Sequence, residues 1–397
     1  MTDFAATRAL FHLPPGVTYL DGNSLGPMPI AAQDRARRVV VEEWGDLLIR
    51  GWNAAGWMAA PARVGDRIAR LIGAPQGSVV MGDTLSIKVY QALASALAMR
   101  PDRRVVLSDS GNFPTDLYMA QGLLASLGSD YRLKVVAPED VADAIDESVA
   151  VTLLTEVDYR TGRRHDMPAL TEKAHGAGAL AIWDLAHSAG AVEVDVSTGR
   201  ADFAVGCTYK YLNGGPGAPA FIYVAPEHHD AALPALSGWM GHAAPFAFDL
   251  DYRPGKGIER MRVGTPAVIA LAVLDAALDA WEGVEMTDVR ARSIALSEAF
   301  IAGVEARCPD VTLASPRDPR ARGSQVGFRH PQAYAVMQAL IVEDVIGDFR
   351  APDILRFGFA PLYNDMADVE RAVTVLADIL STGRWDRPEF HARQAVT

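Results

Sequence analysis

Residues 179–184 read Ala179-Leu180-Ala181-Ile182-Trp183-Asp184, a short apolar run that ends on a carboxylate. A second apolar run, Phe203–Gly206, is followed by Cys207-Thr208-Tyr209-Lys210. Apolar runs of about four to eight residues between polar turns are typical of buried strands. If both runs are parallel strands of one sheet, Asp184 and Lys210 lie at the same edge, beyond the carboxyl ends of the strands, where ligands bind in such sheets.

Short apolar runs that predict strands alternate with segments that predict helices over residues 60–225. The clearest helix is expected over Leu85–Met99, and another over Pro168–His175, which begins with proline at a favoured first-turn position. Buried strands separated by helices predict an α/β fold, with a mainly parallel sheet between helices. The expected strands are Ser78–Met81, Arg104–Leu107, Leu133–Val136, Val149–Leu154, Ala179–Trp183, Phe203–Gly206 and Ala220–Val224.

The character of the sequence changes after Gly264. A long helix is expected over Pro266–Trp281 and an amphipathic helix over Thr287–Arg307, before shorter elements and a basic, proline-containing tail. We therefore expect a large domain over residues 56–275 and a smaller α+β C-terminal domain over residues 276–397. Residues 1–55 include a helix expected over Ile30–Arg50, and we expect this segment to pack on the small domain.

The composition excludes several classes of function. With 37 basic and 49 acidic residues the net charge is −12, so we expect no nucleic-acid partner and no binding to anionic membranes. No apolar run approaches the ~20 residues that span a bilayer, and the N-terminus lacks the layout of a secretory signal. Cys207 and Cys308 are too few for a disulfide framework or a zinc cage. We therefore expect a cytoplasmic protein without a metal ion.

Asp184 and Lys210 together suit pyridoxal 5'-phosphate (PLP). A lysine can form an imine with this aldehyde, and a carboxylate can keep the pyridine nitrogen protonated, which makes the ring an electron sink. Gly82-Asp83-Thr84, between a strand and a helix, offers free amides and a helix dipole for a phosphate. Phe113 offers an aromatic face. Each residue also has a purely structural interpretation: a solvated lysine, a turn-forming aspartate, a threonine N-cap and a core aromatic residue.

Six segments stand out in order along the chain: Tyr19–Gly26, Asn112–Asp116, Trp183–His187, Thr208–Asn213, Gly238–His242 and Arg356–Tyr363. Together they resemble the kynureninase family. Kynureninases are PLP-dependent hydrolases of the aspartate aminotransferase superfamily, and they cleave L-kynurenine to anthranilate and L-alanine in tryptophan catabolism. The resemblance implies the PLP-dependent transferase fold type I, a homodimer with active sites at the interface, and L-kynurenine, with 3-hydroxykynurenine as a second substrate to consider.

The resemblance also implies roles for individual residues. Lys210 would form the imine and act in catalysis with Tyr209. Arg356 would bind the substrate carboxylate, which suits the planar fork of a guanidinium, although an arginine that bridges the two domains is the structural alternative. The aryl ring of such a substrate needs an apolar pocket, and Trp52, Trp57 and Trp239 are the candidates for its walls. Trp239 and Thr265 would come from the neighbouring subunit. The implied cofactor-binding residues are Thr84, Leu85, Phe113, Asp116, Thr155, Asp184, His187, Tyr209, Lys210, Trp239 and Thr265.

Three other interpretations stay open at this point. An aminotransferase or a cysteine desulfurase of the same superfamily would share the lysine and the aspartate, although a desulfurase needs a nucleophilic cysteine on a mobile loop. A nucleotide-binding module is disfavoured because neither Gly82–Thr84 nor Gly214–Gly217 matches a P-loop. A non-enzymatic binding protein would not explain why Lys210 and Asp184 are gathered at one sheet edge.

Overall fold

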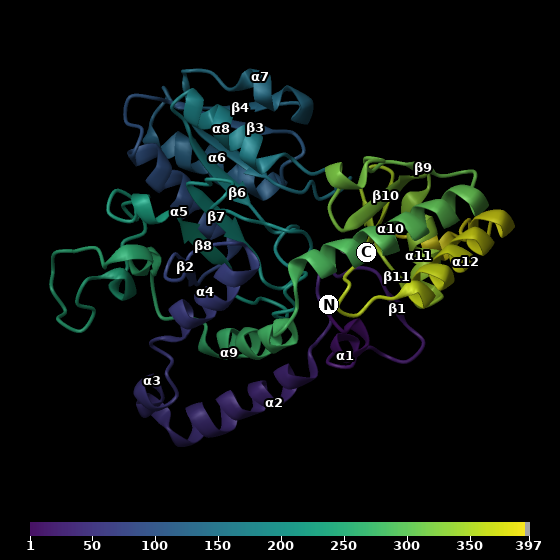
Figure 1. Ribbon diagram of the computed structural model, residues 1–397, viewed down its shortest axis with the longest axis horizontal. Coiled ribbons are helices and arrows are strands. Elements are labelled where there is room, and N and C mark those ends of the chain that lie inside the picture. Colours follow the sequence, from purple (N-terminus) through teal and green to yellow (C-terminus); the bar gives the residue numbers. More distant parts are fainter. Residues whose placement is uncertain (394–397) are drawn as a thin grey trace.

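The computed structural model describes residues 1–393 and shows two lobes (Figure 1). A seven-stranded sheet with the order β2-β8-β7-β6-β5-β3-β4 forms the larger lobe. Only β8 runs antiparallel to its neighbours, so the carboxyl ends of the other six strands lie at one edge. All seven predicted strands are confirmed, with ends shifted by at most two residues. They are β2 (Val79–Met81), β3 (Val105–Asp109), β4 (Arg132–Val136), β5 (Val149–Thr155), β6 (Leu180–Asp184), β7 (Phe203–Gly206) and β8 (Phe221–Val224).

Helices cover both faces of this sheet. Successive strand residues point to opposite faces, so Val106 belongs to the core under α5 (Leu85–Ala98) and α6 (Pro114–Leu127), whereas Leu107 belongs to the core on the other face. Thr84 caps α5, because its hydroxyl oxygen accepts a hydrogen bond from the Ile87 amide over 3.5 Å. The predicted helix at Pro168–His175 is confirmed as α8 (Met167–Gly176).

The smaller lobe is built on an antiparallel sheet with the order β12-β13-β10-β9. Phe300 lies in the centre of its core, with ring centroids 4.8 Å from Phe357 and 6.1 Å from Phe328. The elements are α10 (Met286–Arg307), β9 (Thr312–Leu313), β10 (Gln325–Arg329), α11 (Ala333–Val342), β12 (Asp348–Arg350), β13 (Ile354–Gly358), α12 (Met366–Thr382) and α13 (Pro388–His391). The last four residues of the predicted basic tail lie outside the described residues.

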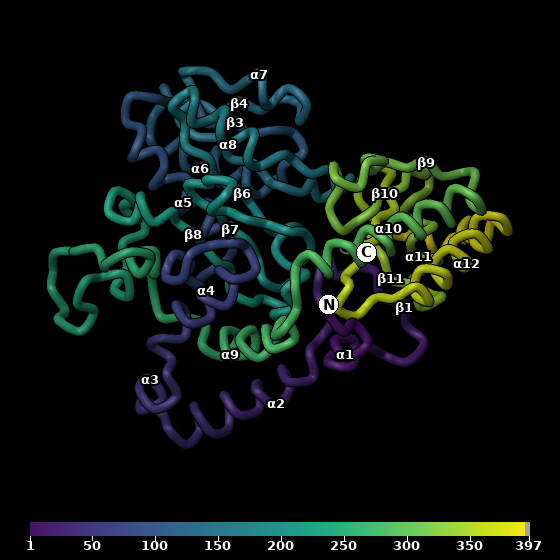
Figure 2. Tube along the Cα trace, viewed as in Figure 1, coloured from purple at the N-terminus to yellow at the C-terminus, as the bar shows by residue number. Residues whose placement is uncertain are grey.

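The N-terminal segment contacts both lobes (Figure 2). After α1 (Phe4–Arg8), β1 (Thr18–Tyr19) pairs in parallel with β11 (Val345–Ile346), whereas α2 (Ile30–Arg38) packs along α9 (Val268–Ala277). The helix predicted over Ile30–Arg50 is present in three pieces: α2 ends at Arg38, a π-helical turn follows over Val39–Asp46, and a 3-10 turn covers Leu48–Arg50. Three β-branched valines at the start of the π-helical turn disfavour the regular α conformation. The predicted domain boundaries near residues 55 and 275 remain a proposal.

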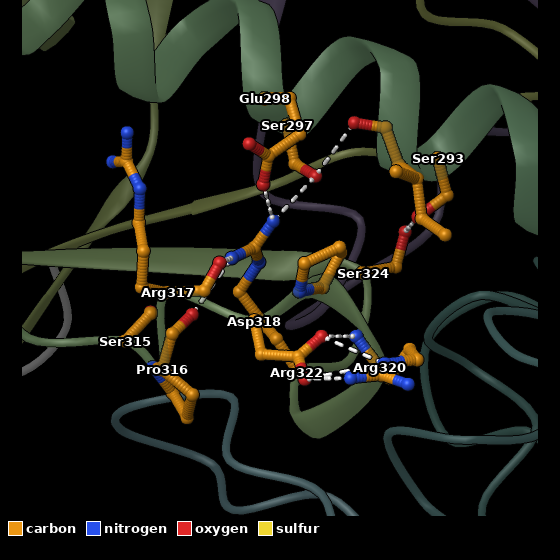
Figure 3. A network of polar contacts seen from close by, with 12 residues as sticks. Ser293, Ser297, Glu298, Ser315, Pro316, Arg317, Asp318, Arg320, Arg322 and Ser324 are labelled. Carbon is orange, nitrogen blue, oxygen red and sulfur yellow. Dashed lines mark hydrogen bonds and ion pairs between the residues drawn. The ribbon is translucent and has the colours of Figure 1, made fainter.

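A buried arginine fixes the loop before β10 to α10 (Figure 3). Arg322 donates hydrogen bonds to the Glu298 carboxylate, to the Ser297 hydroxyl over 3.3 Å and to the Pro316 carbonyl over 2.7 Å. The amide of Gly323 then donates to the carbonyl of Gly162 over 2.7 Å, in the turn that follows β5. The small lobe is thereby joined to a turn of the large lobe that reaches the site described next.

Across residues 1–393, no helix combines the length and the apolar composition that are needed to cross a bilayer.

Candidate active site

Lys210 lies in the loop after β7, at the carboxyl edge of the large sheet. Its Nζ atom lies 3.3 Å from Nε2 of His187, 5.9 Å from the ring centroid of Phe113 and 5.8 Å from that of Tyr209. The loop backbone is held in place, because the Gly26 amide donates to the Tyr209 carbonyl over 2.7 Å. Residues from the ends of three different strands therefore surround one half-buried amine.

Two buried carboxyl groups lie at the same edge. Asp184 ends β6, and its Oδ1 accepts a hydrogen bond from the Ala186 amide over 2.8 Å. Asp116, in the first turn of α6, is buried close enough to Asp184 for the two carboxyl groups to influence each other. Burial raises the pKa of both groups, the charge of Asp184 raises the pKa of Asp116 further, and the charge of Lys210 opposes both shifts. We therefore expect Asp116 to hold the proton of the pair and Asp184 to carry the negative charge.

Thr155 and His187 complete this edge. Thr155 is the last residue of β5 and lies opposite Asp184 in the parallel register, with its hydroxyl 3.5 Å from the Asp184 carbonyl. His187 is buried, and its Nε2 lies 3.2 Å from the carbonyl of Asn23. Burial, with the charges of Lys210 and two arginines, holds the pKa of His187 well below its usual range. The imidazole beside Lys210 is therefore neutral at physiological pH.

The turn before α5 has the geometry of an anion site. Gly82 (φ 157°) and Asp83 (φ 55°) both lie in the left-handed region, and two hydrogen bonds to Ala220 of 2.9 and 3.0 Å hold the turn. Thr84 is exposed and Leu85 is half-buried. The first amides of a helix have no partner within the helix, so this turn presents free N–H groups and a positive dipole end.

Arg356 lies in β13 and is 1% exposed. Its Nε donates to Oδ1 of Asp348 over 2.7 Å, and its Nη2 donates to Oδ2 of Asp348 and to the Ser24 hydroxyl, the latter over 2.8 Å. Its Nη1 donates to the Tyr159 carbonyl. A guanidinium has five N–H groups, so these four contacts leave one N–H of Nη1 for a ligand.

The surroundings of Arg356 are electropositive. Arg350 lies beside it, with Nη2 2.6 Å from Oδ2 of Asp348. Burial and the charge of Asp348 raise the pKa of Asp21 to about 7, so Asp21 is partly protonated near neutral pH. The guanidinium groups of Arg350 and Arg356 thus face two acidic side chains. Asp348 is ionised, whereas Asp21 is only partly ionised near neutral pH. This charge balance favours an anionic ligand.

Three predicted site residues lie apart from the Lys210 cluster within residues 1–393, where no hydrogen bond, ion pair or ring contact joins them to it. The indole N–H of Trp57 donates to Glu43 over 2.9 Å, and Trp57 lines an apolar cavity of about 660 Å³ with Trp44 and α9. Trp239 is 40% exposed and Thr265 is also exposed. Exposure of Trp239 and Thr265 is consistent with the predicted role of both residues in a neighbouring subunit.

Three further residues of the site had no role predicted from the sequence. Ser24 and Asp348 hold Arg356, and the ring of Tyr159 packs edge-on against Phe113 with centroids 5.1 Å apart. A signal for Asp348 exists in the sequence. It lies eight positions before Arg356, across the turn Ala351-Pro352-Asp353, a spacing that suits opposite charges on facing strands of a hairpin.

Comparison with solved structures defines the class of fold. The apo cysteine desulfurase of Thermococcus onnurineus NA1 superposes with a TM-score of 0.80 at 19% identity, covering 96% of this chain and 99% of that one. A C-DES variant with glycine covalently linked to its PLP cofactor gives a TM-score of 0.79 at 18% identity, covering 95% and 100%. The fold is therefore fold type I of the PLP-dependent enzymes, as the sequence predicted.

Comparison of sequences defines the family within that class. The family model for the kynureninase C-terminal domain matches residues 289–376. Kynureninases of Burkholderia pseudomallei (strain 1106a) and Pseudomonas fluorescens are 52% and 50% identical over 400 residues, covering 99% of this chain and 96% of each relative. The chain belongs to the kynureninase family. The predicted family and the predicted cofactor, PLP, are both confirmed.

Proposed function

We propose that this protein hydrolyses the Cβ–Cγ bond of L-kynurenine to give anthranilate and L-alanine, with 3-hydroxykynurenine as a second substrate to test. The observation that carries this proposal is 52% identity to a kynureninase over 99% of the chain. The site adds support, because an amine, a buried carboxylate pair and the electropositive surroundings of Arg356 lie where these two lobes meet. We also propose a cytoplasmic location, since both cysteines are buried and unpaired.

The residues at the sheet edge fit PLP. Oδ2 of Asp116 is buried without a hydrogen-bond partner among the described residues, and the Phe113 ring is 41% exposed beside Lys210. When bound, the cofactor withdraws electrons from the substrate α-carbon, which makes the Cβ–Cγ bond cleavable. The residues that would hold it are Asp184 at the pyridine nitrogen, Phe113 on the ring face, Asp116, Thr155 and His187 around the ring, and Thr84, Leu85 and Tyr209 at the phosphate.

Lys210, Tyr209 and Arg356 would act on the substrate directly. The Lys210 amine is the group placed to remove the substrate α-proton and to return a proton later. The neighbouring Cys207 and burial raise the pKa of Tyr209, so its hydroxyl keeps its proton and serves as a hydrogen-bond donor. The remaining N–H of Arg356 would bind the substrate carboxylate and thereby orient the α-carbon.

A homodimer is the assembly that the surface supports. Large apolar side chains are exposed in and just after the π-helical turn and in the loop after Trp239; they are Val40, Val41, Trp44, Leu48, Ile49, Phe246, Phe248 and Leu250. Clusters of exposed large apolar side chains are typical of interfaces. We expect sedimentation equilibrium to give about 85 kDa, twice the chain mass of 42.6 kDa. A mass near 42.6 kDa at enzyme-assay concentrations would contradict the dimer.

The direct test of the proposed function is anthranilate fluorescence after adding L-kynurenine to the PLP-loaded protein. We expect turnover with L-kynurenine, and parallel assays with 3-hydroxykynurenine show which ring the pocket prefers. Release of sulfide from L-cysteine, or amino transfer to a keto acid, without any anthranilate would favour a desulfurase or an aminotransferase and overturn the proposal.

A further inference from the structure

Lys88 is a fully buried lysine for which the proposed reaction has no use. It is the fourth residue of α5, and its side chain is 0% exposed. Its Nζ lies 3.2 Å from Oδ2 of Asp83, 2.8 Å from Oε1 of Gln91 and 3.2 Å from the carbonyl of Met261. These three acceptors match the three N–H groups of an ammonium.

The position of this ammonium is electrostatically unfavourable without a nearby anion. Burial penalises the charged form and lowers the pKa of Lys88, and the ion pair with Asp83 opposes that shift only in part. The first turn of a helix is also the positive end of its dipole, where cations are disfavoured. An apolar side chain of similar volume would stabilise such a site as well as a buried ion pair does. Stability alone therefore gives no reason for a lysine here.

Asp83 supplies the reason. It lies in the middle of the turn Gly82–Thr84, which we assign to the cofactor phosphate, and its side chain is 33% exposed. Its carboxylate would repel a phosphate dianion at the same turn. The ammonium of Lys88 lies on the buried side of Asp83 and offsets this negative charge.

We propose that Lys88 is a positioning residue for the cofactor phosphate. It neutralises Asp83 and holds the turn Gly82–Thr84 from behind, so that the helix amides and the Thr84 hydroxyl can receive a dianion. Gln91 supports the same arrangement, because its Nε2 donates to the Met261 carbonyl that Lys88 also contacts. The inference rests on the proposed phosphate role of this turn.

The test compares PLP with pyridoxal, which lacks the phosphate. Dissociation constants of both aldehydes are measured spectroscopically for the wild type and for Lys88→Met, whose side chain has similar length and no charge. We expect Lys88→Met to weaken PLP binding by about tenfold and to leave pyridoxal binding unchanged. Lys173→Met, at a partly exposed lysine on α8, is the matched control and should change neither constant.

Two further variants separate a charge effect from a loss of structure. Asp83→Asn should bind PLP at least as tightly as the wild type, and Asp83→Asn with Lys88→Met should recover most of the lost PLP affinity. Equal weakening of PLP and pyridoxal, or a lower unfolding temperature of the apo-protein with unchanged PLP affinity, would show that Lys88 is only structural. Weaker PLP binding by Asp83→Asn would also overturn the inference. A wild type that binds neither aldehyde would instead refute the proposed function.

Discussion

Lys210→Ala is expected to abolish both anthranilate formation and the visible absorbance of the cofactor bound covalently to the protein. Lys210 is the one lysine in the cluster with His187, Phe113 and Tyr209, and no other lysine of residues 1–393 contacts those side chains. Loss of the group that moves the α-proton should lower kcat by about a thousandfold or more. The measurements are anthranilate fluorescence and the absorbance spectrum after gel filtration.

A matched control keeps this result specific. Lys134→Ala removes a lysine that is 38% exposed at its side chain and pairs with Asp146, and it should retain both signals. Circular dichroism of Lys210→Ala should show an intact fold, because the backbone around it is held by hydrogen bonds that the side chain does not make, such as Gly26 to Tyr209. Turnover or covalent absorbance that persists in Lys210→Ala would refute the assignment.

Arg356→Gln is expected to lower kcat/KM for L-kynurenine by about tenfold to 150-fold, because the one N–H of Arg356 left for the substrate makes a hydrogen bond to a charged carboxylate, which contributes roughly 1.5–3 kcal/mol. The same change leaves the buried Asp348 without its main partner, so it should also destabilise the fold by about 3 kcal/mol or more. The measurements are steady-state kinetics and thermal unfolding.

The two effects of Arg356→Gln can be separated. Adding Asp348→Asn removes the unpaired charge, so the double variant should regain much of its unfolding temperature while kcat/KM stays low. The decarboxylated analogue kynuramine provides a second control, because its affinity should not depend on Arg356. Recovery of kcat/KM in the double variant, or equal losses of affinity for kynurenine and kynuramine, would show that Arg356 acts only on stability.

The large sheet could be predicted from the sequence because most of its strands are short buried apolar runs, although the edge strand β4 is partly exposed and carries Arg132 and Lys134. The positions of residues at strand ends could be predicted in the same way. Because β6 and β7 are parallel neighbours, Asp184 and the loop carrying Lys210 must lie at the same edge of the sheet. The helical run over Ile30–Arg50 was predicted, but its local pattern does not show the change from α to π conformation at Val39 or the 3-10 turn that begins at Leu48.

The contacts around Arg356 could not be predicted, because they depend on how distant segments dock. Ser24 lies in the segment that follows β1, which pairs with β11, and the Tyr159 carbonyl lies in the turn after β5, which contacts the loop fixed by Arg322. Neither pairing leaves a local signal in the sequence. The sequence signal of Trp57 is ambiguous, because an aromatic side chain suits the apolar cavity near α9 as well as a substrate pocket.

The three partners of Arg356 come from three remote parts of the chain: Ser24 from the N-terminal segment, Tyr159 from the large lobe and Asp348 from the small lobe. A nascent or partly unfolded chain lacks one or more of these partners, and its guanidinium is then neither oriented nor shielded from water. The site can therefore bind the amino-acid substrate only after these three parts of the chain have docked in the folded protein. An incompletely folded molecule would therefore not convert its substrate at all.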